Sequence, residues 1–221
     1  MVSSGASAAW CVQIIYIACA ANISLMIHRD IVYFEKAGGQ NTDDTIRLAL
    51  QRAIELNIKH VVVASTTGET GVKVANAFGG GNVRVIVVGH QVGFSKPGER
   101  ELDDQYAKQL NELGATVIEA THALSGVERS ISRKLGGASR VEAIAEALRT
   151  VISVGTKVCV EISVMAADAG KVPVDGRTEI LAIGGTWDGA DTACVIRPAH
   201  ANNFFDLHVL EIVCMPREKS R

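Results

Sequence analysis

The sequence predicts an α/β fold built on a mostly parallel β-sheet, and three observations support this prediction. Two apolar, β-branched runs, His60–Ala64 and Val83–Val88, flank a polar turn and a short helical segment, which is the pattern of a β-α-β unit. The chain carries 21 glycines, and aromatic residues make up only 5% of it. Hydrophobic residues make up 48% of the 221 residues, which is enough for a large core. This composition suits tight turns between strands and helices better than an all-β sandwich.

The first half of the chain continues in the order that such a sheet requires. Ile31–Phe34 is an apolar run suited to a buried strand. Asn41–Asn57 has apolar residues at helical spacing and two acidic residues in its first turn, which predicts a helix. Asp103–Leu113 has the pattern of a further helix, and Thr116–Ala120 that of a further strand. The chain therefore predicts strands and helices in alternation up to residue 120.

The second half predicts another helix and three more strands. A helix is expected from Ser139, and Lys157–Met165 is predicted to be a strand with the carboxylate of Glu161 at its middle. Burying an unpaired charge is costly, so this carboxylate needs a partner or a function. Thr192–Ile196 is expected to be a strand, and the short connection to His208–Met215 allows this last strand to be antiparallel at an edge.

Two short motifs have the spacing of a helix capping box. Thr66 with Glu69 and Ser139 with Glu142 both place a hydroxyl three residues before a carboxylate, at the expected start of a helix. Capping is sufficient to explain Thr66 and Glu69, but the same turn also has the chemistry of a ligand contact, and both roles are compatible.

The first thirty residues stand apart from this pattern. Ala8–Ile27 contains no charged residue and is long enough to span a bilayer, but Gln13, Asn22 and Ser24 weaken that interpretation. The alternatives are a start at Met26, an inert extension, a membrane anchor or a genuine extra element. We therefore expect two parts, an apolar extension over 1–29 and one α/β domain over 30–221, with membrane contact only if the extension is an anchor.

The charge and the cysteine content limit the classes of function that the protein can have. The formal net charge is −2, the isoelectric point is near 6.3, and no long basic run exists, which argues against a nucleic-acid partner. The five cysteines form no CxxC pair, so neither a disulfide framework nor a structural zinc site is expected. A reducing, cytoplasmic setting fits best, and the sequence is compatible with a homo-oligomer.

Polar loops recur after the expected strands. They are Ser65–Thr70, His90–Phe94, His122–Arg133, Ala166–Gly170, Gly184–Thr186 and His200–Asp206. Because the carboxyl ends of parallel strands meet at one edge of a sheet, we expect most of these loops to gather there, although each is also explained as a simple turn. Ser65–Thr70 leads into a helix, whose free N–H groups favour a phosphate or a carboxylate.

Two further groups of side chains have alternative explanations. Arg129–Lys134 combines three cations with two hydroxyls, which suits phosphate but also suits a solvated helix face. His90, His122 and His200 all follow strands, and convergence would make them metal ligands or an acid–base site. No HxH or HExxH spacing supports a metal, so none is expected.

Several long motifs resemble those of the pyruvate kinase C-terminal-domain-like family. They are IVYFEKAGGQNTDDT, HVVVASTTGETGVKVA, VIVVGHQVGF, LSGVERSISRKLGG, KVCVEISVMAADAG, GADTACVIRPAHANNFFD and EIVCMP. The resemblance covers Ile31 to about Lys219. The family consists of stand-alone α/β proteins, mostly archaeal and bacterial, without an established activity.

The resemblance implies a Rossmann-like three-layer α/β/α sandwich, with a mostly parallel sheet and an antiparallel edge strand. In full-length pyruvate kinase the element matching Ser65–Thr70 binds a phosphate of the allosteric sugar bisphosphate. The barrel that carries catalysis is absent from this sequence, so no pyruvate kinase activity is expected. Some family members hold flavin mononucleotide (FMN), whose single terminal phosphate suits a helix start.

The leading hypothesis is therefore a soluble protein that binds a phosphorylated small molecule, most plausibly FMN, on Ser65–Thr70. The alternatives are a flavin-dependent oxidoreductase, its substrate space lined by His122, Glu161, His200 and Asn203, and a non-catalytic sugar-phosphate-sensing module. The catalytic residues are unknown. The expected ligand-binding residues are Ser65, Thr66, Thr67, Gly68, Glu69, Thr70, His122, Ser125, Gly126, Arg129, Arg133, Gly184, Gly185, Thr186, His200 and Asn203.

Overall fold

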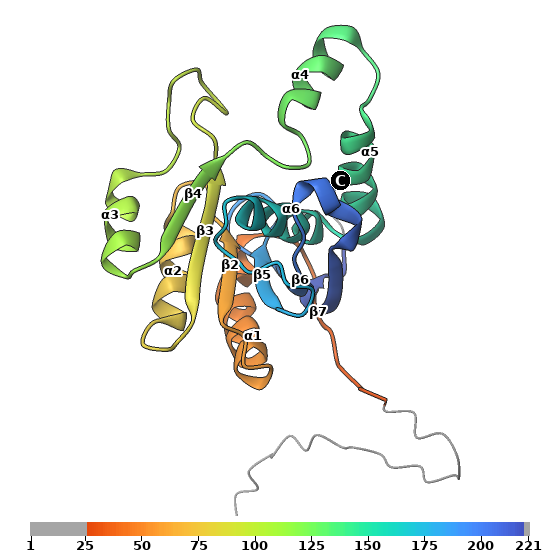
Figure 1. Ribbon diagram of the computed structural model, residues 1–221. Helices are drawn as coiled ribbons and strands as arrows, with labels where there is room; N and C mark the ends of the chain where they lie inside the picture. The colour runs from red at the N-terminus through yellow and green to blue at the C-terminus, as the bar shows by residue number, and fades with distance from the viewer. Residues whose placement is uncertain (1–25, 219–221) are drawn as a thin grey trace, which may run out of the picture. The chain divides into compact units, whose positions relative to one another are not determined.

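The computed structural model describes residues 26–218 (Figure 1). The chain divides into Met1–Asp30 and Ile31–Arg221, and every helix and strand of the described residues lies in the second unit. Most of the apolar stretch Ala8–Ile27 falls outside the described residues. Among residues 26–218, no helix has both the length and the apolar character needed to cross a membrane.

The second unit is an α/β fold with one seven-stranded sheet. The strands are β1 (Val32–Phe34), β2 (His60–Ala64), β3 (Arg84–His90), β4 (Thr116–Ala120), β5 (Ile180–Gly184), β6 (Thr192–Arg197) and β7 (His208–Pro216). The α-helices are α1 (Thr42–Glu55), α2 (Glu69–Phe78), α3 (Asp104–Glu112), α4 (Gly126–Leu135), α5 (Arg140–Ala147) and α6 (Val154–Asp168). Short helical segments follow at η1 (Gly39–Asn41), η2 (Leu148–Ile152, a π-helix) and η3 (Ala201–Asp206).

The strand order across the sheet is β1-β7-β6-β5-β2-β3-β4. The strands β5, β2, β3 and β4 run parallel to one another, and β1 runs parallel to β7. Strand β6 is antiparallel to both of its neighbours, β5 and β7. The expected antiparallel pairing of the last strand is therefore present toward one side of the sheet, where the three-residue β1 supplies the outermost strand.

Helices cover both faces of this sheet, as a three-layer sandwich requires (Figure 1). Side chains of α1, α2 and α3 pack with Val61, Val63 and Val87 on one face. Side chains of α5 and α6 pack with Val62 and Ile86 on the other face. Alternate residues of one strand thus enter opposite cores, which explains why the central strands are apolar without interruption. The fold class predicted by the sequence is confirmed.

One predicted element is wrong. Lys157–Met165 is not a strand but the middle of helix α6, which spans Val154–Asp168. Twelve of its residues are buried, because α6 packs against β2, β5 and β6 of the sheet and against η2. A helix buried on nearly all sides shows no amphipathic period, so its sequence has the apolar run of a buried strand.

The capping box predicted at Ser139 and Glu142 is confirmed at the start of α5. The Ser139 hydroxyl accepts a hydrogen bond from the Glu142 N–H at 3.1 Å, and the Glu142 carboxylate accepts one from the Ser139 N–H at 3.0 Å. The Ser132 hydroxyl of α4 also donates to this carboxylate. The box therefore joins the end of α4 to the start of α5, and these two helices frame the pocket described below.

Candidate functional site

The Ser65–Thr70 turn lies at the carboxyl end of β2 and leads into α2. Its key residue is Gly68, which adopts a left-handed conformation with φ of +103°. A side chain at this position would meet Cβ of Tyr106 at 2.6 Å and Cδ1 of Leu102 at 2.7 Å. The Thr67 carbonyl accepts a hydrogen bond from Asp103 N–H at 3.0 Å, which ties the turn to the start of α3. Both the backbone conformation and the packing therefore require glycine here.

The capping box predicted for Thr66 and Glu69 is absent, because Gly68 caps α2 and no side chain makes a cap hydrogen bond. Instead, the buried Ser65 hydroxyl accepts a hydrogen bond from Gly71 N–H at 3.1 Å. Glu69 lies along the helix and pairs with Lys73 at 3.4 Å. The first N–H groups of a helix have no partner within it. At the start of α2, neither the Thr66 nor the Glu69 side chain accepts a cap hydrogen bond from them. The carboxylate at Glu69 is thus partly neutralised by Lys73.

Three rings gather at the carboxyl ends of β3 and β4, next to this turn. The ring centroids of His90 and Phe94 are 4.1 Å apart, and that of His122 lies 4.8 Å from His90 and 5.0 Å from Phe94. The Arg129 guanidinium stands 5.6 Å from the Phe94 ring centroid, a cation–π geometry. The structure thus brings the predicted His90, His122 and Arg129 together, and Phe94 fills the space between them.

Glu101 anchors this ring cluster. Its carboxylate lies 2.5 Å from Nδ1 of His90 and accepts a hydrogen bond from the Ser95 hydroxyl. These contacts, with Ser95 contributing most, lower the pKa of Glu101, so the carboxylate stays ionised beside His90. Sequence reasoning missed Glu101, because it lies eleven residues from its partner in an irregular loop.

Lowering the pH from 7 to about 4 is expected to destabilise the protein through His122. Burial is the largest cause that lowers the pKa of His122 from 6.5 to about 4, and the charge of Glu161 opposes it. Smaller effects in the same direction as burial come from His90, Lys157 and Arg129. Between pH 6.5 and 4 the unfolded chain takes up a proton at this residue that the folded chain does not bind, so stability falls as the pH falls through this window. Allowing for partial exposure, we expect a loss of about 1–2 kcal/mol.

Urea unfolding at a series of pH values measures this effect. His122→Gln removes the titrating group, so its free energy of unfolding should fall less between pH 7 and 4 than that of the unmodified protein. His208→Gln alters an exposed histidine on β7 and serves as the matched control. Equal slopes for the two variants would contradict the role assigned to His122.

A buried ion pair lies under the ring cluster. Lys157 and Glu161, one helical turn apart on α6, form a salt bridge with side chains only 5% and 4% exposed. The second oxygen of Glu161 accepts a hydrogen bond from Leu124 N–H at 2.9 Å, in the loop after β4. The partner that the sequence required for Glu161 is therefore Lys157 together with this backbone group. Burial lowers the pKa of Lys157, and Glu161 opposes that effect.

The expected Arg129–Lys134 segment forms most of α4. Ser125 caps this helix without a side-chain hydrogen bond, and Gly126 begins it with φ of +43°. Arg129 is half-buried against Phe94, whereas Arg133 is exposed and lies away from the rings. The structure thus separates two arginines that the sequence placed in one group.

The Gly184–Thr186 turn ends β5 at the same edge, but its conformation is explained by packing. A side chain on Gly185 would meet the Gly189 carbonyl oxygen at 2.6 Å. Thr186 is 3% exposed, and its N–H donates to the fully buried Asp191 carboxylate at 3.2 Å. The same carboxylate accepts from Gly38 N–H at 3.0 Å. These residues join the ends of β1 and β5 through Asp191.

The expectation that His200 and Asn203 join this edge is wrong. Both follow β6, and β6 runs antiparallel to β5, so its carboxyl end lies at the opposite edge of the sheet. His200 there pairs with Asp168 at 3.1 Å, at the end of α6. The loop expected at Ala166–Gly170 is likewise the end of that helix. The substrate space proposed for an oxidoreductase therefore does not form from His122, Glu161, His200 and Asn203.

Arg149 is a pocket residue that sequence reasoning missed. It lies in η2, twenty positions beyond Arg129, and the two line the same pocket. Its sequence context, a helical surface rich in charge, gave no signal of this pairing. Among residues 26–218, no cluster of His, Cys, Asp and Glu has the geometry of a metal site. Compared with models of known protein families, the chain matches none.

Proposed function

We propose that this protein binds a phosphorylated small molecule at the carboxyl edge of its parallel strands, with the phosphate on the Ser65–Thr70 turn. The observation that carries the proposal is the build of that turn. Gly68 is left-handed and packs so closely against Tyr106 and Leu102 that no side chain covers the turn there. Ser65 already accepts a hydrogen bond from Gly71 N–H, which leaves the N–H groups before it in α2 to an anion.

FMN is the ligand we propose. Its phosphate suits a helix start, and its flat ring system suits the aromatic side chains His90, Phe94 and His122, which follow the two neighbouring strands at the same edge. The resemblance of the sequence to the pyruvate kinase C-terminal-domain-like family supports the same ligand. Ligands of open α/β sheets commonly bind at this edge.

Titration of the purified protein with FMN, followed by flavin fluorescence, tests this proposal. We expect Thr67→Glu to weaken FMN binding at least about 100-fold, because it places a carboxylate beside the phosphate position. Thr67 is exposed, so the fold should tolerate the change. Asn82→Glu adds the same charge at the exposed turn before β3, at the opposite edge, and should bind FMN normally.

Two outcomes would contradict the proposal. Failure of the unmodified protein to bind FMN would exclude this ligand, and equal FMN affinity in the Thr67→Glu and Asn82→Glu variants would exclude the turn as the phosphate site. Gly68→Asp is unsuitable as the test, because the clash of its Cβ with Tyr106 and Leu102 would alter the fold together with the charge.

A further inference from the structure

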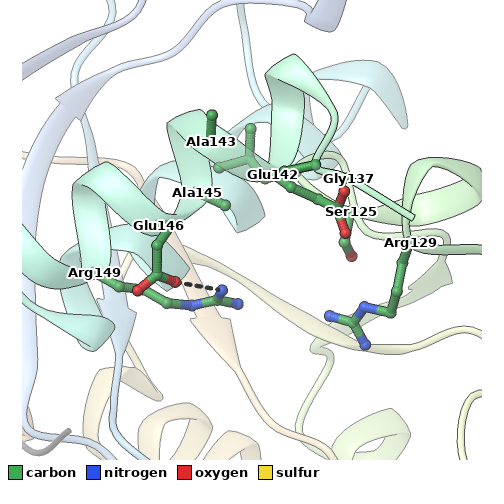
Figure 2. Close-up of a pocket in the computed structure, with 10 residues that line it drawn as sticks. Ser125, Arg129, Gly137, Glu142, Ala143, Ala145, Glu146 and Arg149 are labelled. Carbon is green, nitrogen blue, oxygen red and sulfur yellow. Dashed lines mark ion pairs between the residues drawn. The ribbon is translucent and has the colours of Figure 1, made fainter. Parts of the chain in front are cut away.

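A pocket of about 380 Å³ opens between α4, α5 and η2 (Figure 2). The residues that line it are Leu124, Ser125, Arg129, Gly137, Ala138, Glu142, Ala143, Ala145, Glu146 and Arg149. None of these residues belongs to the Ser65–Thr70 turn. The volume falls within the range of small-molecule sites in proteins.

The pocket carries two arginines from different elements. Figure 2 shows the Arg129 and Arg149 guanidinium groups on the same side of the pocket, reaching toward each other from α4 and η2. Arg149 makes only a long ion pair with Glu146, at 3.7 Å. Arg129 has no carboxylate within salt-bridge distance among residues 26–218, and its one aromatic contact is Phe94. Two guanidinium groups that line one pocket and are held by no short ion pair are suited to an anion.

A hydroxyl without a protein partner lies at the same place. Ser125 lines the pocket and is only 7% exposed, yet its hydroxyl makes no hydrogen bond within the described part of the chain. Ser125 also caps α4, a ten-residue helix whose first N–H groups have no partner within the helix. The Ser125 oxygen is not among the fully buried polar atoms without a partner, so this hydroxyl is open to the pocket and free to donate to a ligand that accepts hydrogen bonds.

A third cation, Lys157, lies close enough to both arginines to interact with their charges. Lys157 is buried, and the charges of Arg149 and Arg129 contribute to lowering its pKa, after the larger effect of burial. Glu161 already balances Lys157, whereas Arg129 has, in the described part of the chain, only the longer-range attraction of Glu142. An anion between the arginines would relieve the repulsion among all three cations.

Two carboxylates limit what else the ligand carries. Glu142 and Glu146 both line the pocket, and Glu142 is held by Ser132 and Ser139. Two carboxylates repel a second anionic group but accept hydrogen bonds from hydroxyls. The donors of the pocket come from two guanidinium groups, a hydroxyl and a helix start, and therefore from several directions. A tetrahedral anion accepts hydrogen bonds from more of these directions than a planar carboxylate does.

We propose that the pocket between α4, α5 and η2 is a second ligand site, which takes the phosphate group of a small phosphate monoester on Arg129, Arg149 and Ser125. This site goes beyond the FMN site proposed above and does not depend on it. It lies outside the Ser65–Thr70 turn, so a charge added at Thr67 leaves it intact.

Isothermal titration with inorganic phosphate, in the Thr67→Glu variant, tests the second site alone. We expect one phosphate to bind per chain, and Arg149→Gln or Arg129→Gln to weaken it at least about tenfold, the usual effect of losing one charge-assisted hydrogen bond. Arg133→Gln is the matched control, since it removes the same charge from an exposed position of α4 that does not line the pocket. Its phosphate affinity should change less than about twofold.

Three outcomes would overturn this proposal. The first is the absence of phosphate binding to a Thr67→Glu variant with an unchanged circular dichroism spectrum. The second is equal weakening by Arg149→Gln and Arg133→Gln, which would indicate a general charge effect. The third is acetate binding as tightly as phosphate, which would exclude the phosphate assignment. Failure of FMN to bind the unmodified protein would overturn the proposed function and leave this site standing.

Discussion

Lys157→Met is expected to lower the free energy of unfolding by about 3–5 kcal/mol at pH 7. The substitution removes the cation that pairs with Glu161, and both side chains are nearly inaccessible to water. Glu161 would keep only the Leu124 N–H as a partner, and an uncompensated buried carboxylate is costly. Chemical denaturation followed by circular dichroism measures the change.

The double variant Lys157→Met/Glu161→Met serves as the internal comparison. It replaces the pair by apolar side chains of similar length, and we expect it to recover most of the lost stability. Arg47→Met breaks an exposed pair with Asp44, 2.9 Å long, on α1, and should cost less than about 1 kcal/mol. If Lys157→Met cost no more than Arg47→Met, the buried pair would have no special role in stability.

Gly155→Ala is expected to destabilise the protein by about 2–3 kcal/mol. A Cβ at this position would meet the Thr192 side chain at 2.1 and 2.5 Å and the Asp191 carboxylate at 2.9 Å. Both neighbours are fully buried, so they have no room to move away from α6. Alanine favours helices by up to about 1 kcal/mol over glycine, which does not offset the clash. Thermal and urea unfolding measure the loss.

Gly81→Ala provides the control for this prediction. A Cβ at Gly81 would have only the Phe78 carbonyl oxygen nearby, at an ordinary contact distance of 3.7 Å, in the exposed turn before β3. We expect this variant to change the free energy of unfolding by no more than about 0.5 kcal/mol. A similar cost at both glycines would mean that close packing of α6 against β6 is not what requires glycine at position 155.

Helix α6 illustrates how a local pattern misleads. The apolar run from Lys157 to Met165 has the composition of a buried strand, because the helix is enclosed on nearly all sides. One local signal favoured a helix, since Lys157 and Glu161 are spaced four residues apart and meet only on a helical face. In a strand they would also share a face but would stand too far apart to pair.

The positions predicted for the ligand-site loops also differ in how far they depend on local sequence. The Ser65–Thr70 turn and the loops after β3 and β4 lie at one edge of the sheet, as expected, because they follow consecutive parallel strands. His200 and Asn203 were misplaced, because nothing near them in sequence records that β6 runs the other way. Arg149 was missed for a related reason, since only the packing of η2 near α4 puts it in the same pocket as Arg129.

The sequence by itself determined the α/β class, the central strands, the Ser139–Glu142 capping box and the position of the Ser65–Thr70 turn. Each of these depends on residues close together in the chain, where side-chain periodicity and turn chemistry act directly. Only the tertiary structure decided the direction of β6, the burial of α6 and the presence of Arg129 and Arg149 in one pocket. Those features result from packing between segments far apart in the chain, and a local pattern carries no record of such neighbours.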